Sequence, residues 1–391
     1  MQNTSNSRDL RLIRIYYFLW IGAGGFLSPF ITLFYKSRGL NGVEIGLLGT
    51  FDAVTGMLAA PFWGRWGDAS SHPRRLIMLA LLASACFALL QGIQSLFWTI
   101  SIFIILDGLI TAGTGSLSNV QAIMAVNGEK SGFGSIRLWG SLGWAVITVL
   151  AGLLIEKLGL YVPFAGYAGM LVAAVFVLFF VRGSPKPKTI IKRPERVPFG
   201  QMVTTLAHNR TVLGMALAFT VIWITTMGRS QFETLYMTSL GAHASLIGIA
   251  NTVSALFEVP FMLLADRLIR LHGSRRILRI SLLAQAASFL PVVLFPALPS
   301  FFILRILASI ALSFNVPAYY SCLVESAPEG QGGTVVSIFD VTLRSGVALL
   351  ALPLAGLLFD QLGAYWLYPI GLGGCLLAWL ILEAMLRTDP I

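Results

Sequence analysis

The sequence predicts an all-α integral membrane protein with twelve transmembrane helices in two pseudo-symmetric six-helix bundles. Three observations lead to this fold class. The composition is too apolar for a soluble chain, apolar stretches of spanning length recur along almost the whole sequence, and one group of residues occurs twice, about 200 residues apart. A repeat at half the chain length predicts two halves of similar structure.

The composition predicts a membrane environment. Of the 391 residues, 56% are hydrophobic and 11% are charged, and the mean hydropathy is +0.80. A soluble chain carries roughly 25% charged residues, so this one is expected to lie in a bilayer. Spans of about 20 apolar residues are expected near residues 12–34, 43–64, 75–95, 97–124, 136–155, 161–181, 211–236, 245–265, 276–295, 300–322, 333–357 and 363–386.

The repeated group contains an Ile-Gly pair, a Pro-Phe pair, an Asp at the end of an apolar run, and two arginines. The first copy is Ile45-Gly46, Pro61-Phe62, Asp68 and Arg74-Arg75, and the second is Ile247-Gly248, Pro260-Phe261, Asp266 and Arg275-Arg276. In each half the Asp and the arginines fall where one apolar helix ends and the next begins.

The basic residues predict the orientation. With twelve spans, 21 of the 27 Lys and Arg residues fall on the side of the termini, and only Lys36, Arg38 and Lys157 fall on the other. By the positive-inside rule both termini are expected in the cytoplasm, in a multi-pass protein of the cell (inner or plasma) membrane. Inner loops that face anionic lipid also account for the net charge of +10, so nucleic acid is not needed as a partner.

A hydrophilic stretch rich in proline and basic residues, from Arg182 to Arg210, divides the chain. Such a segment cannot bury enough apolar surface to fold alone, so it predicts a cytoplasmic tether. The expected domains are an N-terminal bundle over residues 1–184, a linker over 185–209 and a C-terminal bundle over 210–391. The first span is expected to stay in the protein, and the three cysteines lie inside spans, where no disulfide is implied.

In its number of expected helices, its central tether and both copies of the repeated group, the chain resembles the major facilitator superfamily over essentially its whole length. The superfamily has a Gly-x-x-x-Asp-Arg-x-Gly-Arg-Arg-like motif between its second and third helices. The first copy departs from the motif in lacking a basic residue directly after Asp68. A carboxylate beside arginines can form a charge-assisted latch that holds and releases one arrangement of the bundles. The alternative is that these arginines only set the orientation of the chain by the positive-inside rule. The expected latch residues are Gly64, Asp68, Arg74 and Arg75, with Asp266, Arg267, Arg275 and Arg276 in the second half.

A narrower resemblance lies in the fifth expected helix. The run from Phe133 to Trp144 is similar to the Arg-x-x-Gly-x-x-Gly-Trp signature of the branch that includes lactose permease, phenylpropionate permease and nucleoside-proton symporters. The resemblance implies that Arg137 and Trp144 bind substrate. The alternative for Arg137 is an anchor at the inner membrane surface, and the alternative for Trp144 is helix packing or a position at the membrane interface. Asn119 stands where lactose permease has a carboxylate paired with the matching Arg, and Asn315 lies near the position of its proton-coupling Glu, so the resemblance argues against galactosides. An Arg137 without that carboxylate would suit an anionic substrate.

Eight charged residues fall inside the expected spans and away from their ends, five acids and three bases, at a cost of about 2.5 to 3.5 kcal/mol each if they faced lipid. They must therefore face a cavity or one another. Arg229 and Glu233, and likewise Asp340 and Arg344, are four residues apart, so each pair is expected to share a helical face and neutralise itself. Arg305 is expected to lie toward the membrane surface or to balance Glu233 or Glu258.

Three acids have no obvious basic neighbour on their own helix, namely Asp52, Asp107 and Glu258. A carboxylic acid in a low-dielectric surrounding can carry a proton, so one of the three, with Asp52 first, is expected to couple transport to protons. Structural hydrogen bonding is the alternative.

The sequence predicts a transporter rather than an enzyme. All four histidines fall in loops or the tether, and Cys/His metal spacing, a Gly-x-Ser-x-Gly motif and a phosphate-binding glycine loop are missing. We therefore expect alternating-access symport of a small organic solute with protons, without cofactor or metal, by a monomer in the lipid bilayer. The alternatives are proton-coupled efflux of amphipathic drugs or metabolites and, from another class, a receptor or intramembrane enzyme.

Overall fold

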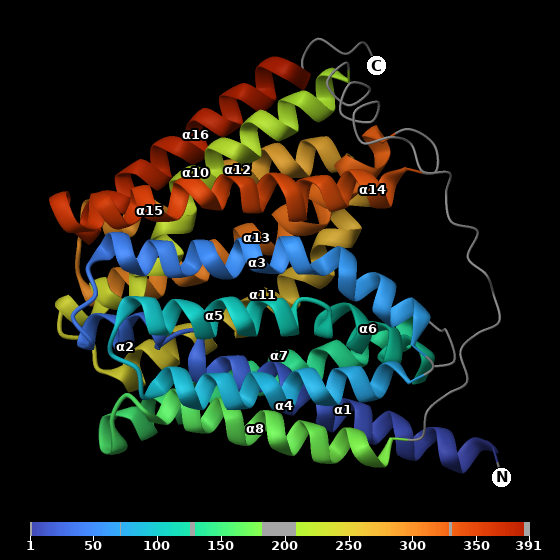
Figure 1. The fold of residues 1–391 in the computed structure, drawn as a ribbon. Coiled ribbons are helices and arrows are strands. Elements are labelled where there is room, and N and C mark those ends of the chain that lie inside the picture. Colours follow the sequence, from blue (N-terminus) through green and yellow to red (C-terminus); the bar gives the residue numbers. More distant parts are fainter. Residues whose placement is uncertain (1, 71, 126–129, 182–208, 328–330, 387–391) are drawn as a thin grey trace. The chain divides into compact units, whose positions relative to one another are not determined.

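The computed structural model describes residues 2–70, 72–125, 130–181, 209–327 and 331–386, in which a few side chains, that of Asp68 among them, lie outside the description. Every regular element in these residues is helical (Figure 1). The elements are α1 (Gln2–Leu27), α2 (Ile31–Ser37), α3 (Gly42–Ala69), α4 (Pro73–Gly92), α5 (Phe97–Thr111), α6 (Thr114–Ala125), α7 (Lys130–Leu158), α8 (Val162–Phe180), α10 (Arg210–Ser239), α11 (Ala244–His272), α12 (Ser274–Leu294), α13 (Leu298–Ser326), α14 (Gly332–Ser337), η1 (Ile338–Leu343), α15 (Arg344–Leu362), η2 (Ala364–Trp366) and α16 (Leu367–Leu386).

Twelve runs of helix in the described residues are long and apolar enough to cross a membrane. The first run joins α1 and α2, the fourth joins α5 and α6, and the eleventh joins α14, η1 and α15. The predicted number of spanning helices is therefore confirmed.

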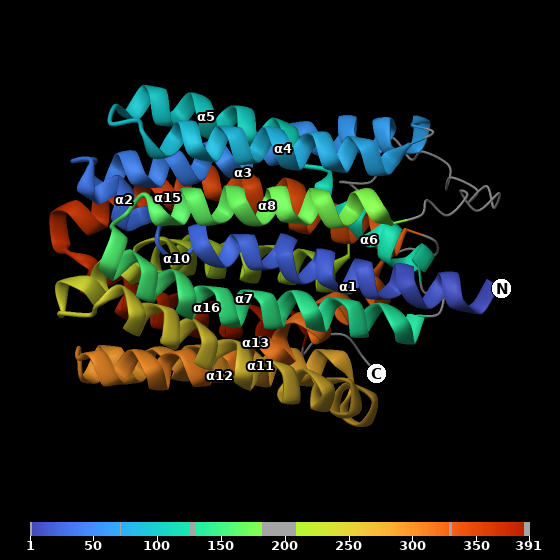
Figure 2. The ribbon, with the colours of Figure 1, turned by 90° about the horizontal axis from the view of Figure 1, so that it is seen from below.

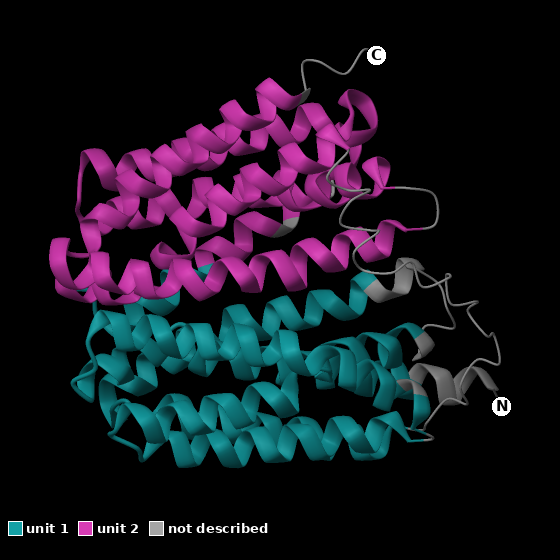
Figure 3. Cartoon of the chain, turned by 45° about the horizontal axis from the view of Figure 1, so that its top comes forward, with its two compact units in different colours: residues 1–187, 241–252 teal, residues 188–240, 253–391 magenta. Residues whose placement is uncertain are grey.

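The chain divides into two compact units (Figure 3). Unit 1 comprises Met1–Pro187 and Gly241–Thr252, and unit 2 comprises Lys188–Leu240 and Val253–Ile391. The predicted linker over 185–209 lies almost wholly outside the described residues, so the expected domain boundaries stay a prediction.

In unit 1, α1 packs between α7 and α8, and α4 packs on both α5 and α8 (Figures 1 and 2). Small residues bring α1 and α7 together. A Cβ on Gly143 would lie 2.2 Å from the carbonyl oxygen of Phe18, and one on Gly140 would lie 2.3 Å from the Ile21 side chain. Such close approach of two helices needs glycine.

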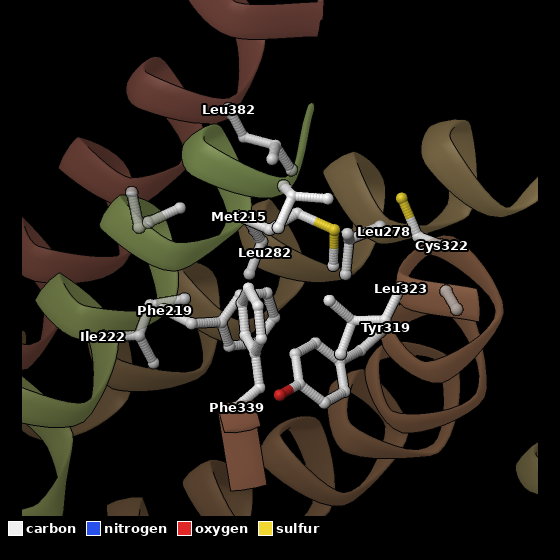
Figure 4. Packing of buried hydrophobic residues seen from close by; sticks show 14 of the residues in the cluster. Met215, Phe219, Ile222, Leu278, Leu282, Tyr319, Cys322, Leu323, Phe339 and Leu382 are labelled. Atoms are coloured by element: carbon white, nitrogen blue, oxygen red, sulfur yellow. The ribbon is translucent and has the colours of Figure 1, made fainter. Parts of the chain in front are cut away.

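In unit 2, α12 packs on α13 and α16, and α10 packs on α15 and α16. Inward faces of α10, α12, α13 and α16, together with Val335 of α14 and Phe339 of η1, form an apolar core (Figure 4). Its centre holds Phe219 of α10 and Tyr319 of α13, whose ring centroids are 4.4 Å apart. The core fixes the helices that carry the charged residues described below.

Candidate functional site

Two carboxylates from different helices lie together in unit 1. Asp52 is on α3 and Asp107 is on α5. The two helices touch beside them, since a Cβ on Gly108 would lie 2.7 Å from the Thr55 hydroxyl and 3.7 Å from the carbonyl oxygen of Asp52. Asp52 and Asp107 interact electrostatically with one another. Helix packing thus brings together two acids that the sequence predicted separately.

Polar side chains from three further helices complete this acidic cluster. Gln91 of α4 donates a hydrogen bond to the hydroxyl of Tyr35 on α2 (2.9 Å), and the hydroxyls of Ser84 and Tyr167 share another (3.0 Å). Tyr35 and Tyr167 both interact electrostatically with the two aspartates, and Asp107 also interacts with Ser84. The sequence analysis missed these four residues, because single hydroxyl and amide side chains inside an apolar run carry no pattern.

The cluster holds acids without a base. Within the described part of the chain, neither Asp52 nor Asp107 forms an ion pair, and Asp107 Oδ1 is buried without a hydrogen-bond partner. Two neighbouring carboxylates without a counter-charge repel one another when both are ionised. The arrangement can therefore bind a proton or another cation.

Two of the residues implied by the permease resemblance lie near one tyrosine on α1. The Tyr17 hydroxyl donates a hydrogen bond to Asn119 Oδ1 (2.8 Å), and Tyr17 interacts electrostatically with Arg137 of α7. The Arg137 side chain is exposed and forms no ion pair among the described residues. It is thus available to an anionic or hydroxylated solute.

Trp144 occupies a packing position on the same contact between α1 and α7. A Cβ on Gly24 would lie 2.8 Å from its indole ring, so the ring fills the space beside this glycine. Asn315 is also engaged in packing, since its side-chain amide donates to the Ser281 hydroxyl (3.1 Å). Their predicted roles in substrate binding stay predictions.

In unit 2 the predicted pair of Arg229 and Glu233 is formed, at 2.7 Å along α10. Arg305 of α13 also approaches Glu233, with its Nε 2.5 Å from Oε1. One carboxylate therefore lies between two guanidinium groups, and of the two expected partners for Arg305 the structure shows Glu233. Glu258 of α11 is half-buried, and its carbonyl oxygen accepts a hydrogen bond from Ser313 (3.0 Å).

The expected ion pair between Asp340 and Arg344 is wrong for this structure, since none is formed between these two described residues. The Asp340 carboxylate instead accepts hydrogen bonds from Tyr319 (3.0 Å) and Tyr320 (2.7 Å). Asp340 lies in the π-helix η1, where the backbone departs from the α-helical register on which the expectation was based.

Comparisons with known proteins bear on the whole chain. The model of the MFS_1 like family matches residues 10–372. The chain belongs to this family. Maltose permease of Geobacillus stearothermophilus is 26% identical over 367 residues, which cover 90% of this chain and 89% of the permease. Multidrug resistance protein MdtG of Salmonella typhi is 26% identical over 345 residues, which cover 84% of this chain and 83% of MdtG. The crystal structure of the nucleoside transporter NupG superposes with a TM-score of 0.85 at 13% identity, over 97% of this chain and 100% of NupG.

Membership of the MFS_1 like family confirms the predicted resemblance to the major facilitator superfamily and the predicted fold class. The chain is a multi-pass membrane transporter and not an enzyme. In agreement with a transport role, the polar groups described above come from side chains inside the spans.

The expected latch of this MFS_1 like protein is only partly within the description. The Asp68 side chain lies outside it, Gly64 faces open space, Arg74 is half-buried and Arg75 is exposed. In the second copy Asp266, Arg267, Arg275 and Arg276 are all exposed, and Asp266 forms no ion pair among the described residues. Ser274, beside Arg275, donates a hydrogen bond to the Glu325 carboxylate. The latch therefore stays a prediction.

Metal-ligating side chains do not gather in the part of the chain that is described: no three of His, Cys, Asp and Glu lie where they could hold one ion.

Proposed function

We propose that this transporter takes up a small organic solute together with protons, and that Asp52 and Asp107 carry the coupling proton. The observation that supports the proposal most directly is the acidic cluster of unit 1, where two carboxylates lie together without a basic partner among the described residues. Charges inside spans are costly unless they serve a function or are paired.

The proposed coupling follows from the charge of the cluster. Two adjacent carboxylates without a basic partner among the described residues favour a state in which they share one proton. Release of that proton on one side of the membrane and uptake on the other would link the proton gradient to the transport cycle. Substrate would contact Arg137 in unit 1, since its guanidinium is exposed and can form paired hydrogen bonds to a carboxylate or a sugar. We further propose a monomer in the cell membrane with both termini in the cytoplasm.

The test is solute flux into proteoliposomes with an imposed pH gradient, using maltose, uridine, benzoate and a lipophilic cation as candidate solutes. We expect one solute to accumulate only when the proton gradient is directed into the liposomes. Asp52→Asn and Asp107→Asn should abolish accumulation but preserve counterflow exchange, which needs no net proton movement. Asp360→Asn, at an exposed acid near the end of α15, should behave as the wild type. Gradient-driven accumulation by both cluster variants would overturn the proposal.

Efflux is the second candidate direction, and the similarity to MdtG, named a multidrug resistance protein, favours it. The two directions separate in the same assay. A symporter accumulates solute inside the liposome when the proton gradient is directed inward. An efflux antiporter accumulates solute inside only when the proton gradient is directed outward. The absence of any protein-dependent flux would favour a non-transport role.

A further inference from the structure

Both oxygens of the Asp340 carboxylate are occupied by tyrosines of α13. Tyr319 donates a hydrogen bond to Oδ1 (3.0 Å), and Tyr320 donates one to Oδ2 (2.7 Å). Asp340 lies in η1, whereas Arg344 begins α15, and these two described side chains form no ion pair with one another. Two charge-assisted hydrogen bonds thus hold the carboxylate away from the arginine that follows four residues later.

The Arg344 side chain is exposed inside a span. Within the described part of the chain, its guanidinium forms neither an ion pair nor a hydrogen bond. It lies near the middle of the 31-residue span Gly332–Leu362. A charged side chain so far from the ends of a span is costly against lipid, and such residues face one another or a water-filled cavity. Arg344 therefore has donors to offer to a solute that reaches unit 2.

The core of unit 2 fixes the tyrosines that hold Asp340. Tyr319 is 5% exposed, and its ring centroid lies 4.4 Å from that of Phe219 (Figure 4). Tyr319 interacts electrostatically with both Asp340 and Arg344, so these three residues lie near one another. The ring of Tyr320 packs against that of Tyr319 at 5.1 Å and is 39% exposed. An exposed aromatic ring and an exposed guanidinium thus belong to the same cluster.

We propose that Arg344 binds the carboxylate of the transported solute, and that Tyr319 and Tyr320 keep this site open by holding Asp340 away from the guanidinium. A guanidinium donates paired hydrogen bonds that match the geometry of a carboxylate, and the exposed ring of Tyr320 offers apolar surface to the rest of the solute. The two tyrosines act on binding as positioning residues for Asp340. The proposal rests on the proposed function, because it names the chemical group by which unit 2 contacts the transported solute.

The test is binding of benzoate to the purified full-length protein, measured by calorimetry and by the shift in melting temperature. Arg344→Gln should weaken binding about tenfold or more, since it removes a hydrogen-bonded charge. The double variant Tyr319→Phe with Tyr320→Phe should also weaken binding about tenfold, although it keeps every charge, because Asp340 then loses both donors and competes for the arginine. Addition of Asp340→Asn to the double variant should restore affinity to within about threefold of the wild type. A merely structural role of the tyrosines predicts the opposite, since a third substitution would then weaken binding further.

Three controls separate the site from general effects of charge and folding. Benzamide is the neutral isostere of benzoate, and inorganic phosphate is a second anion; we expect benzoate alone of the three to bind. Arg279→Gln, which breaks the ion pair of Arg279 with Glu383 (2.8 Å) elsewhere in unit 2, should leave benzoate affinity unchanged. The proposal is overturned if the wild type does not bind benzoate, if benzamide or phosphate binds equally well, if Arg344→Gln keeps full affinity, or if Asp340→Asn fails to rescue the double variant.

The proposed function fails separately. If benzoate binds as expected and the rescue is seen, but no solute enters proteoliposomes, the site stands and the transport proposal falls. If proton-driven flux depends on Asp52 and Asp107 while Arg344→Gln binds benzoate as the wild type does, only the site is wrong.

Discussion

At the scale of single residues, polar groups inside the spans are held by specific partners, and the loss of one partner has a cost. Gln91 is 7% exposed, and its amide donates to the Tyr35 hydroxyl at 2.9 Å. A buried polar group that loses its hydrogen bond costs about 1 to 3 kcal/mol. The bond between Gln91 and Tyr35 thus supports the edge of the acidic cluster.

We predict that Tyr35→Phe lowers the stability of the purified protein by about 1 to 3 kcal/mol, because it leaves the Gln91 amide without its acceptor. The double variant Tyr35→Phe with Gln91→Leu should recover part of this loss, since neither partner is then left unpaired. The measurement is the melting temperature in detergent. Gln94→Leu is the matched control, because that glutamine lies just after the end of α4 and its side-chain amide donates to the carbonyl of Leu90, and it should change little. Independent, additive effects of the two cluster substitutions would contradict the prediction.

The residue scale also shows where sequence reasoning was sufficient. The pairing of Arg229 with Glu233 follows from a spacing of four on one helix, and the structure forms it. The contact of Arg305 with Glu233 and that of Tyr17 with Asn119 join helices far apart in the chain, and such contacts cannot be derived from helical periodicity. Asp340 shows the converse, since two tyrosines of another helix took the place of the expected arginine.

At the scale of elements, the number of spans follows from hydropathy, but the interruptions within them do not. The fourth span divides into α5 and α6, and Trp63 of α3 explains the division. Its indole donates to the carbonyl of Leu109 (2.7 Å), which a continuous helix would bond to the amide of Gly113. A Cβ on Gly113 would lie 2.4 Å from the Trp63 side chain. The insertion of a side chain from another helix breaks the ladder, and no signal local to residues 97–125 reveals it.

The contact between α1 and α7 makes a prediction about glycine. Gly143→Ala would place a methyl group 2.2 Å from the backbone oxygen of Phe18, which cannot move without displacing α1. We expect a loss of about 1 to 3 kcal/mol or more from overpacking, seen as a lower melting temperature and a lower yield of monodisperse protein. Gly169→Ala on α8 is the control, because its Cβ would meet no atom within 4 Å. That substitution should be neutral or stabilise by up to about 1 kcal/mol, as expected for alanine in a helix. A tolerated Gly143→Ala would show that the two helices can separate at this point.

At the scale of the whole molecule, fold and family follow from features spread over the entire chain. Composition involves all 391 residues, and the twelve apolar runs and the duplicated motif are distributed over both halves of the chain. Local departures such as the π-helix η1 or the missing base after Asp68 therefore leave the prediction of fold and family intact. Substrate and direction depend on a few side chains, which is why relatives of similar identity are named a maltose permease and a multidrug resistance protein. Function at this finer level therefore requires measurement.

The orientation in the membrane is a prediction for the molecule as a whole, made from the excess of basic residues on one side. In a variant without Cys86, Cys322 and Cys375, a single cysteine in place of Lys157 should react with a membrane-impermeant maleimide added to intact cells. A single cysteine in place of Arg276 should react only after the membrane is opened. Both side chains are exposed in the structure, so the contrast reports on sidedness rather than on burial. The transport assay on the same two variants verifies that the membrane contains folded protein. Labelling of Arg276→Cys in intact cells, with Lys157→Cys protected, would place the termini outside. The proposed uptake would then require the proton gradient to act from the opposite face of the transporter.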